Sequence, residues 1–119
     1  IEGYSVSSLE LVPSMLAAVL EQSEWKDASS LRQIVAAGEA LSRSLQQQTF
    51  DVLPHTTLWN LYGPSEAAID VSYYHCSSND TGASPPIGSP IWNTQLYILD
   101  PTLTPVPDGI AGELYIGGA

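Results

Sequence analysis

Short apolar runs and segments of helical periodicity alternate along the first half of the chain, and this alternation most restricts its fold. Pro13 can open a helix in which Leu16, Val19 and Leu20 share one face. The apolar runs have the length and composition of strands, and each stops at a proline or a glycine; they cover residues 4–12, 31–37 and 56–62.

A second helix is predicted over residues 42–50, where Ser44 and Gln47 have the spacing of a capping box. Polar or Ser-, Gly- and Pro-rich stretches at 21–30 and 77–90 are predicted loops. The other apolar runs indicate strands, the last two of them joined by a Pro-rich turn region, at residues 69–76, 95–99 and 113–116. The predicted fold class is therefore α/β, with a βαβαβ unit followed by a mostly β section.

Charge excludes one large class of partner. The 119 residues carry thirteen acidic and three basic groups, for a formal charge of −10. Lys26, Arg32 and Arg43 are the only basic residues, whereas a nucleic-acid partner would require clustered Lys and Arg. An anionic ligand held by residues 44–119 must be neutralised by backbone amides, by a metal or by residues from elsewhere.

Cysteine content and hydropathy limit the possible covalent links, metal sites and compartment of the chain. Cys76 is the only cysteine, which excludes an internal disulfide and a four-cysteine zinc site and suits a reducing, cytoplasmic setting. The sequence has neither an apolar run of 18 residues nor a charged-then-apolar leader, so no membrane association is expected. At this length one domain at most is expected, and the ends of the chain suggest a piece of a longer protein.

Two polar segments follow predicted strands, at positions where open α/β sheets bind ligands. Gly38, Glu39 and Ala40 follow one strand, and residues 60–66 end another. The second segment combines an amide, an aromatic ring, a tight turn, a hydroxyl and a carboxylate. That set suits a nucleotide with Mg²⁺. The residues alone fit equally a strand, a β-turn and an incidental carboxylate.

Five segments, in order, resemble the motifs of adenylate-forming enzymes, the superfamily of nonribosomal peptide synthetase adenylation domains, acyl-CoA ligases and luciferases. The strongest is similar to the family's N-x-Y-G-P-[ST]-E-[AT] motif, and two others to its G-E-x-L and GEL-x-I-G-G segments. The remaining two are similar to the amino-acid-activating branch. They read NLYGPSEAA at 60–68, VAAGEAL at 35–41, AGELYIGG at 111–118, PIGSP with NTQ at 86–95, and LVPSML at 11–16.

The resemblance covers essentially the whole chain and implies part of the large N-terminal region of such an enzyme, truncated at both ends (residues 1–119). The family's phosphate loop, its ribose-binding Asp, an Arg and the C-terminal domain with a catalytic Lys have no counterpart here. On its own, the chain is therefore expected to be inactive.

The resemblance also implies roles for single residues. Glu66 would coordinate the Mg²⁺ bound to ATP, and Ser65, where Thr is commoner, would contact a phosphate. Tyr62 would stack on the adenine and Asn60 would bond its exocyclic amine. The opposite wall and the adjoining turn would come from Gly38, Glu39, Ala40 and Gly63.

The implied reaction is attack of an amino acid carboxylate on the α-phosphorus of ATP, which gives an aminoacyl-adenylate and pyrophosphate. The aminoacyl group then moves to the phosphopantetheine thiol of a carrier domain. Carrier and condensation domains of the parent synthetase are the implied partners. The alternatives are an acyl- or aryl-CoA ligase of the same superfamily and a non-catalytic binding fragment.

Alignment to the family places six residues in the side-chain pocket for the amino acid: Glu10, Val35, Ala37, Leu61, Ile69 and Asp70. Strand alternation independently supports part of this assignment. Val35 and Ala37 lie on the same face of their predicted strand, and Glu10 lies on the same face as Val6 and Val12. A buried unpaired carboxylate is costly. We therefore expect a substrate with a cationic or hydrogen-bond-donating side chain, such as ornithine, arginine, lysine or a hydroxy amino acid, unless Glu10 or Asp70 pairs with another residue of the parent.

The sequence assigns no chemistry to its histidines and tryptophans. His55 and His75 lack metal-ligand spacing, and both are predicted to be surface or packing residues. Packing roles are likewise predicted for Trp25, Trp59 and Trp92.

Overall fold

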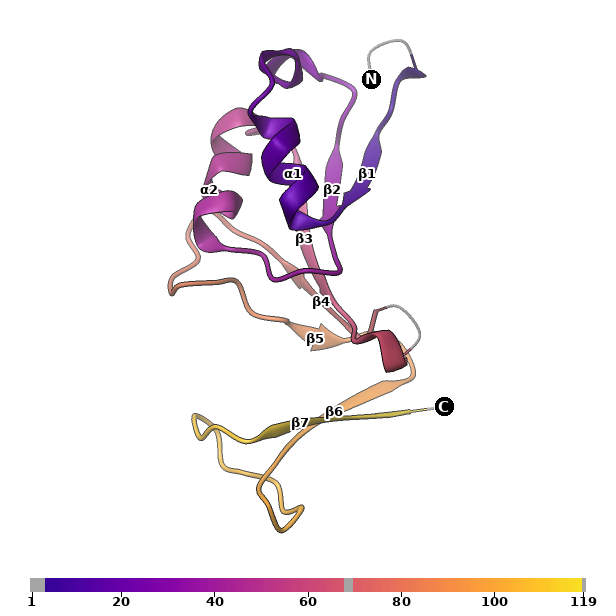
Figure 1. Cartoon of the computed structure of the whole chain (residues 1–119), viewed down its shortest axis with the longest axis vertical. Coiled ribbons are helices and arrows are strands. Elements are labelled where there is room, and N and C mark those ends of the chain that lie inside the picture. The colour runs from indigo at the N-terminus through magenta and orange to yellow at the C-terminus, as the bar shows by residue number, and fades with distance from the viewer. Residues whose placement is uncertain (1–3, 68–69, 119) are drawn as a thin grey trace.

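The computed structural model describes residues 4–67 and 70–118, which form a five-stranded sheet, two covering helices and a separate hairpin (Figure 1). The sheet has the order β1-β2-β3-β4-β5. Its first three strands are parallel, and β4 and β5 add to the edge in antiparallel sense. The strands are β1 (Ser8–Leu11), β2 (Gln33–Ala36), β3 (Thr57–Tyr62), β4 (Ser72–His75) and β5 (Ser89–Pro90).

The helices α1 (Pro13–Leu20) and α2 (Arg43–Val52) connect the parallel strands and lie next to each other against the sheet (Figure 1). Successive crossovers of the same hand, made in one direction along a sheet, bring both helices to the same face. The core lies between them and that face, where Leu16, Ile34 and Leu58 are 0–1% exposed. Along β2 and β3, alternate side chains are therefore buried in this core.

Residues 94–118 form a second, two-stranded antiparallel sheet. The strands β6 (Thr94–Leu99) and β7 (Glu113–Gly118) pair along their full length. Together with the first sheet they confirm the predicted α/β class, a βαβαβ unit followed by a mostly β section. None of the helices in the described part of the chain has the length and apolar content of a bilayer span.

The structure corrects several predicted boundaries. The first strand begins at Ser8, where pairing with Gln33 starts, and the predicted loop at 21–30 contains the 3₁₀ helix η2 (Ser23–Asp27). The fourth strand runs over Ser72–His75, although Val71 N–H already donates to Tyr62 O at 2.7 Å. The loop at 77–90 ends in β5, and α2 extends to Val52. In each case hydrogen-bond partners, which periodicity does not reveal, determine the ends.

The predicted capping box on α2 is wrong by two residues. Ser42, not Ser44, is the N-cap, and its Oγ accepts a hydrogen bond from Leu45 N–H at 3.2 Å. Ser44 lies inside the first turn, with its Oγ 3.0 Å from Ser42 Oγ. The backbone of Ser42 is extended (φ −84°, ψ 153°), the conformation an N-cap needs, and this decides between the two serines.

Cys76 follows β4 with 3% of its surface exposed. Burial, reinforced by the nearby Asp80 charge, raises the pKa of the thiol to about 12. Because the thiolate is the reactive form, iodoacetamide at pH 8 is expected to alkylate Cys76 at least about 100-fold more slowly in the folded protein than in urea. Mass spectrometry of timed samples measures both rates. Equal rates would show that the thiol is not shielded.

Candidate functional site

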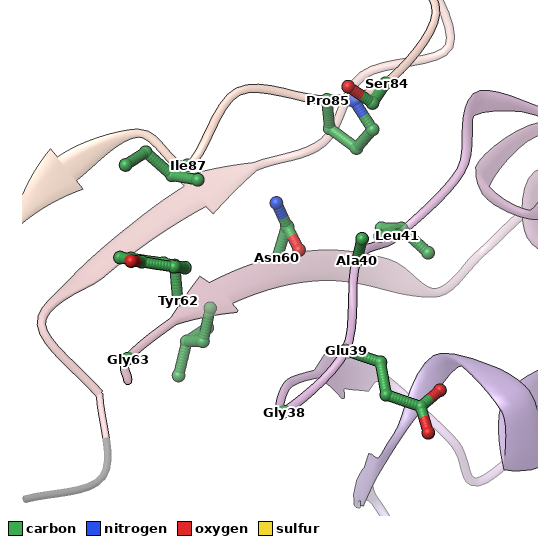
Figure 2. A pocket seen from close by; sticks show the side chains of 11 residues that line it. Gly38, Glu39, Ala40, Leu41, Asn60, Tyr62, Gly63, Ser84, Pro85 and Ile87 are labelled. Carbon is green, nitrogen blue, oxygen red and sulfur yellow. The ribbon is translucent and has the colours of Figure 1, made fainter. Parts of the chain in front are cut away.

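A cavity of about 360 Å³ opens at the carboxyl ends of β2 and β3 (Figure 2). Three segments line it, and the sequence places them far apart: residues 38–41, residues 60–63, and Ser84, Pro85 and Ile87. The first two are the polar strand ends that the sequence singled out, and the structure brings them together. The third was missed, because composition identified residues 77–90 only as a loop.

Asn60 and Tyr62 belong to the helix-facing side of β3, which also carries the buried Leu58. Asn60 is 6% exposed, and its Nδ2 donates to Pro86 O at 2.9 Å. Figure 2 shows the amide oxygen on the other side, toward Ala40. That oxygen has no hydrogen-bond partner among the residues that the structure describes. The amide is thus held with an acceptor free toward the cavity.

The loop after β2 forms the facing wall, with Gly38 in a left-handed conformation (φ +83°) that favours glycine. Glu39 turns its carboxylate away from the cavity (Figure 2). One carboxylate oxygen accepts from Ser14 N–H at 2.9 Å and the other from Ser14 Oγ at 3.0 Å, so Glu39 caps the first turn of α1. Any contribution of Glu39 to the wall therefore comes from its backbone.

Tyr62 is half-buried at the end of β3, and Figure 2 shows its ring on the same side of the cavity as Ile87. An aromatic face and an aliphatic side chain at the rim, with a polar amide deeper inside, suit a flat heterocycle that bears an amino group. The cavity provides these features without any charged side chain turned into it.

Ser65 and Glu66 do not line this cavity. Both are exposed on the short 3₁₀ helix η3 (Ser65–Ala67), directly after the Gly63–Pro64 turn. Glu66 lines a second cavity of about 470 Å³ between η3 and the hairpin, with Thr94, Gly117 and Gly118 among the other lining residues. The GEL-x-I-G-G segment therefore borders the same cavity as the carboxylate predicted to bind metal, an arrangement that motif order alone does not reveal.

The predicted magnesium role fits this environment. The described residues contain no group of three His, Cys, Asp or Glu side chains placed to hold a metal ion. Mg²⁺ bound with a nucleotide needs only one or two protein carboxylates, because phosphate and water oxygens complete its shell. A single exposed carboxylate on a cavity wall meets that requirement.

The other face of the sheet carries part of the predicted amino acid pocket. Glu10, Val35, Trp59 and His75 are consecutive register partners across four strands, and we call them the open-face row. Trp59 stacks on His75 with ring centroids 4.7 Å apart, which agrees with the predicted packing role of these two side chains. The packing role predicted for Trp92 is wrong, because that residue is 96% exposed.

The remaining pocket residues lie around this row. Leu61 is two residues beyond Trp59 on the same strand and also borders the 360 Å³ cavity. Ala37 is buried one residue beyond β2, and Asp70 is half-buried ahead of β4. Ile69 lies outside the described residues. The structure thus gathers Glu10, Val35 and Leu61 on one face and leaves Ala37 and Asp70 near its edge.

Comparison with known proteins explains the motifs. A family model described as AMP-binding enzyme matches residues 1–119. The chain belongs to the AMP-binding enzyme family. Phosphinothricin tripeptide synthetase PhsB of Streptomyces viridochromogenes is 47% identical over 113 residues, 95% of this chain and 9% of that protein. Enterobactin synthase component F of Escherichia coli is 43% identical over 123 residues, 97% of this chain and 9% of that protein.

Solved structures place this AMP-binding chain among nonribosomal peptide synthetases. FmoA3, in its α-methyl-L-serine-AMP bound form, matches with a TM-score of 0.87 and 25% identity over 98% of this chain and 14% of that one. PA1221, which contains adenylation and PCP domains, matches with a TM-score of 0.84 and 25% identity over 94% of this chain and 23% of that one. The recognition from motifs is confirmed. Because the chain spans 9% of each curated relative named above, their substrates and partners bear on it only as proposals.

Proposed function

We propose that this chain supplies the adenine wall and the metal carboxylate of an adenylation domain that activates an amino acid with ATP. The observation that supports it most is the free acceptor oxygen of Asn60 beside the Tyr62 ring in one cavity at the strand ends. An adenine has the matching parts, a flat π-system and an exocyclic amine that donates.

The roles of Tyr62, Asn60 and residues 38–40 follow from this fit, and those of Ser65 and Glu66 follow from the resemblance of residues 60–68 to the family motif. Tyr62 stacks on the adenine, Asn60 Oδ1 accepts from the exocyclic amine, and the backbone of residues 38–40 forms the opposite wall with the turn at Gly63. Ser65 Oγ donates to a phosphate oxygen. Glu66 holds Mg²⁺ through its carboxylate; when bound, Mg²⁺ offsets the negative charge of the phosphates.

In the reaction, a carboxylate oxygen of the amino acid forms a bond to the α-phosphorus while the bond to the pyrophosphate oxygen breaks. The residues of this chain orient the nucleotide for in-line attack and stabilise charge on the phosphates. The aminoacyl group then passes to the phosphopantetheine thiol of a carrier domain, with release of AMP. Since residues 44–119 contain no Lys or Arg, the cations that act on the phosphates come from other parts of the synthetase.

Pyrophosphate exchange tests this function. The synthetase that contains this chain is incubated with ATP, labelled pyrophosphate and single amino acids. We expect label to enter ATP only when a particular amino acid is present. Exchange that depends on fatty or aryl carboxylic acids and ignores amino acids would contradict the proposal, as would exchange by the isolated 119-residue chain.

The open-face row suggests the substrate class. Glu10 is exposed beside the half-buried Val35, so its carboxylate is free to meet a cationic or donating side chain above the sheet. Glu10→Gln is expected to lower kcat/KM for that amino acid by about 10–100-fold, the range for a lost hydrogen bond to a charged group. Exchange assays with ornithine, arginine, lysine and serine measure it.

Glu21→Gln provides the control, because Glu21 is exposed at the end of α1, away from the row. It should leave kcat/KM unchanged for every amino acid. A wild-type preference for leucine or phenylalanine would refute the charged-pocket interpretation.

A further inference from the structure

Arg43, the first residue of α2, is committed to the loop that follows β4. Its guanidinium meets five acceptor oxygens. Nη2 donates to Thr81 O at 2.8 Å and to Ser84 O at 3.1 Å, and Nε donates to Gly82 O at 3.2 Å. Nη1 donates to Gln46 Oε1 and lies 3.3 Å from Asp80 Oδ2. Of the directed donors of the planar fork, Nε and Nη2 point into this loop, whereas Nη1 lies between Gln46 on α2 and Asp80 in the loop.

Asp80 joins the same network from inside the loop. Its carboxylate accepts from Ser77 N–H at 2.9 Å, Gln46 Nε2 at 2.9 Å and Tyr74 Oη at 2.7 Å. Partial desolvation acts to raise the pKa of Asp80, but these hydrogen bonds and the Arg43 charge outweigh it and lower the pKa to about 2. The loop is therefore fixed at its start through Asp80 and along residues 81–84 through Arg43.

The fixed segment runs directly into the nucleotide cavity. Ser84, the last residue that Arg43 contacts, lines the cavity, and so does Pro85 after it. Pro86 O then accepts the hydrogen bond from Asn60 Nδ2, and Ile87 O accepts from Ser72 Oγ at 2.7 Å. The consecutive prolines restrict the backbone between these anchors. The position of Ser84 thereby influences where the Pro86 carbonyl lies.

We propose that Arg43 is a positioning residue for nucleotide binding: by fixing residues 81–84 it holds the Pro86 carbonyl that orients the Asn60 amide. This inference rests on the proposed function, because it concerns the acceptor that Asn60 presents to adenine. Without the clamp, the carbonyl moves and the Asn60 amide loses the partner that keeps its oxygen toward the cavity. Arg43 then acts on adenine binding and not on the chemistry at the phosphorus.

The test compares Arg43→Ala, Arg43→Lys and Asp80→Asn in the synthetase that contains this chain. Isothermal titration gives the Kd of AMP, and exchange assays give KM for ATP and kcat. Arg43→Ala is expected to raise the Kd of AMP and the KM for ATP about tenfold, as for one lost hydrogen bond, with kcat within about twofold of wild type. Arg43→Lys should not restore AMP affinity, because one ammonium cannot span the separate carbonyls. Asp80→Asn should weaken AMP binding less, since it leaves the three Arg43 contacts to loop carbonyls in place.

Arg32→Ala is the matched control, since Arg32 has an exposed side chain next to β2. It should change none of these constants. Hydrogen exchange at residues 77–84 should quicken in Arg43→Ala and stay unchanged in the control. If wild type binds AMP and both Arg43 variants bind it equally well, the positioning role is wrong; Arg43→Lys covers the case in which Arg43→Ala does not fold. A wild type that binds no AMP overturns the proposed function itself, and this inference with it.

Discussion

Replacing Glu66 with glutamine in the synthetase is expected to lower kcat for adenylate formation by about 100-fold or more. Glutamine keeps the size and one oxygen of the side chain but removes the charge that a divalent cation requires. Since Glu66 is exposed on the short helix η3, the substitution should leave the fold unchanged. Single-turnover measurement of aminoacyl-adenylate over a range of Mg²⁺ concentrations reports the loss, and the variant should require more Mg²⁺.

Glu24 offers a matched control for that experiment. It too is an exposed carboxylate on a short 3₁₀ helix, η2, which comes before β2, whereas the 360 Å³ cavity lies beyond the carboxyl ends of β2 and β3. Glu24→Gln should turn over like wild type at every Mg²⁺ concentration. Turnover of Glu66→Gln within twofold of wild type would remove the metal role from this carboxylate.

The largest expected effect on stability comes from Gly88→Ala. Gly88 has φ +83°, and a Cβ there would lie 1.9 Å from Tyr73 O and 2.5 Å from Tyr73 C. The neighbours are backbone atoms of β4, so no side chain can move aside. Backbone strain and the clash together should lower the free energy of unfolding by about 3 kcal/mol or more. Urea unfolding followed by circular dichroism measures the change.

Gly82→Ala separates strain from the clash. Gly82 has a similar φ of +94°, but its Cβ would meet no heavy atom within 4 Å. Only the left-handed conformation is then unfavourable, at a cost of about 1–2 kcal/mol. If the free energy of unfolding fell equally in both variants, the close approach of Gly88 to β4 would not contribute to the loss of stability.

Sequence reasoning predicted the parts of the molecule that depend on local periodicity. The short apolar run at residues 56–62, stopped by the Gly63–Pro64 turn, identified β3, and the rule that ligands bind beyond strand ends brought Gly38 and Asn60 to one cavity. The cavity wall formed by Ser84, Pro85 and Ile87 could not be predicted from the sequence. Its position depends on hydrogen bonds from Arg43, 38 to 41 residues away along the chain, and nothing local in a Ser- and Pro-rich loop indicates them.

Glu39 illustrates a second limit. Its motif indicated a cavity residue, and the backbone does lie at the cavity. A helix N-terminus 25 residues earlier in the chain offers two donors to its carboxylate, and those donors decide where the side chain points. Residue type and spacing identified the segment, whereas competition between distant partners fixed the orientation.

The pleat of β3 has a consequence for how specificity can change over evolution. Asn60 and Tyr62 face the 360 Å³ cavity, and Trp59 and Leu61 alternate with them on the other side of the strand, although Leu61 borders the cavity as well. Under the proposed function, substitutions at 59 and 61 would therefore alter the amino acid site while the side chains at 60 and 62 that contact ATP stay unchanged. We expect laboratory selection for altered substrates to accept changes at these odd-numbered positions far more readily than at 60 and 62.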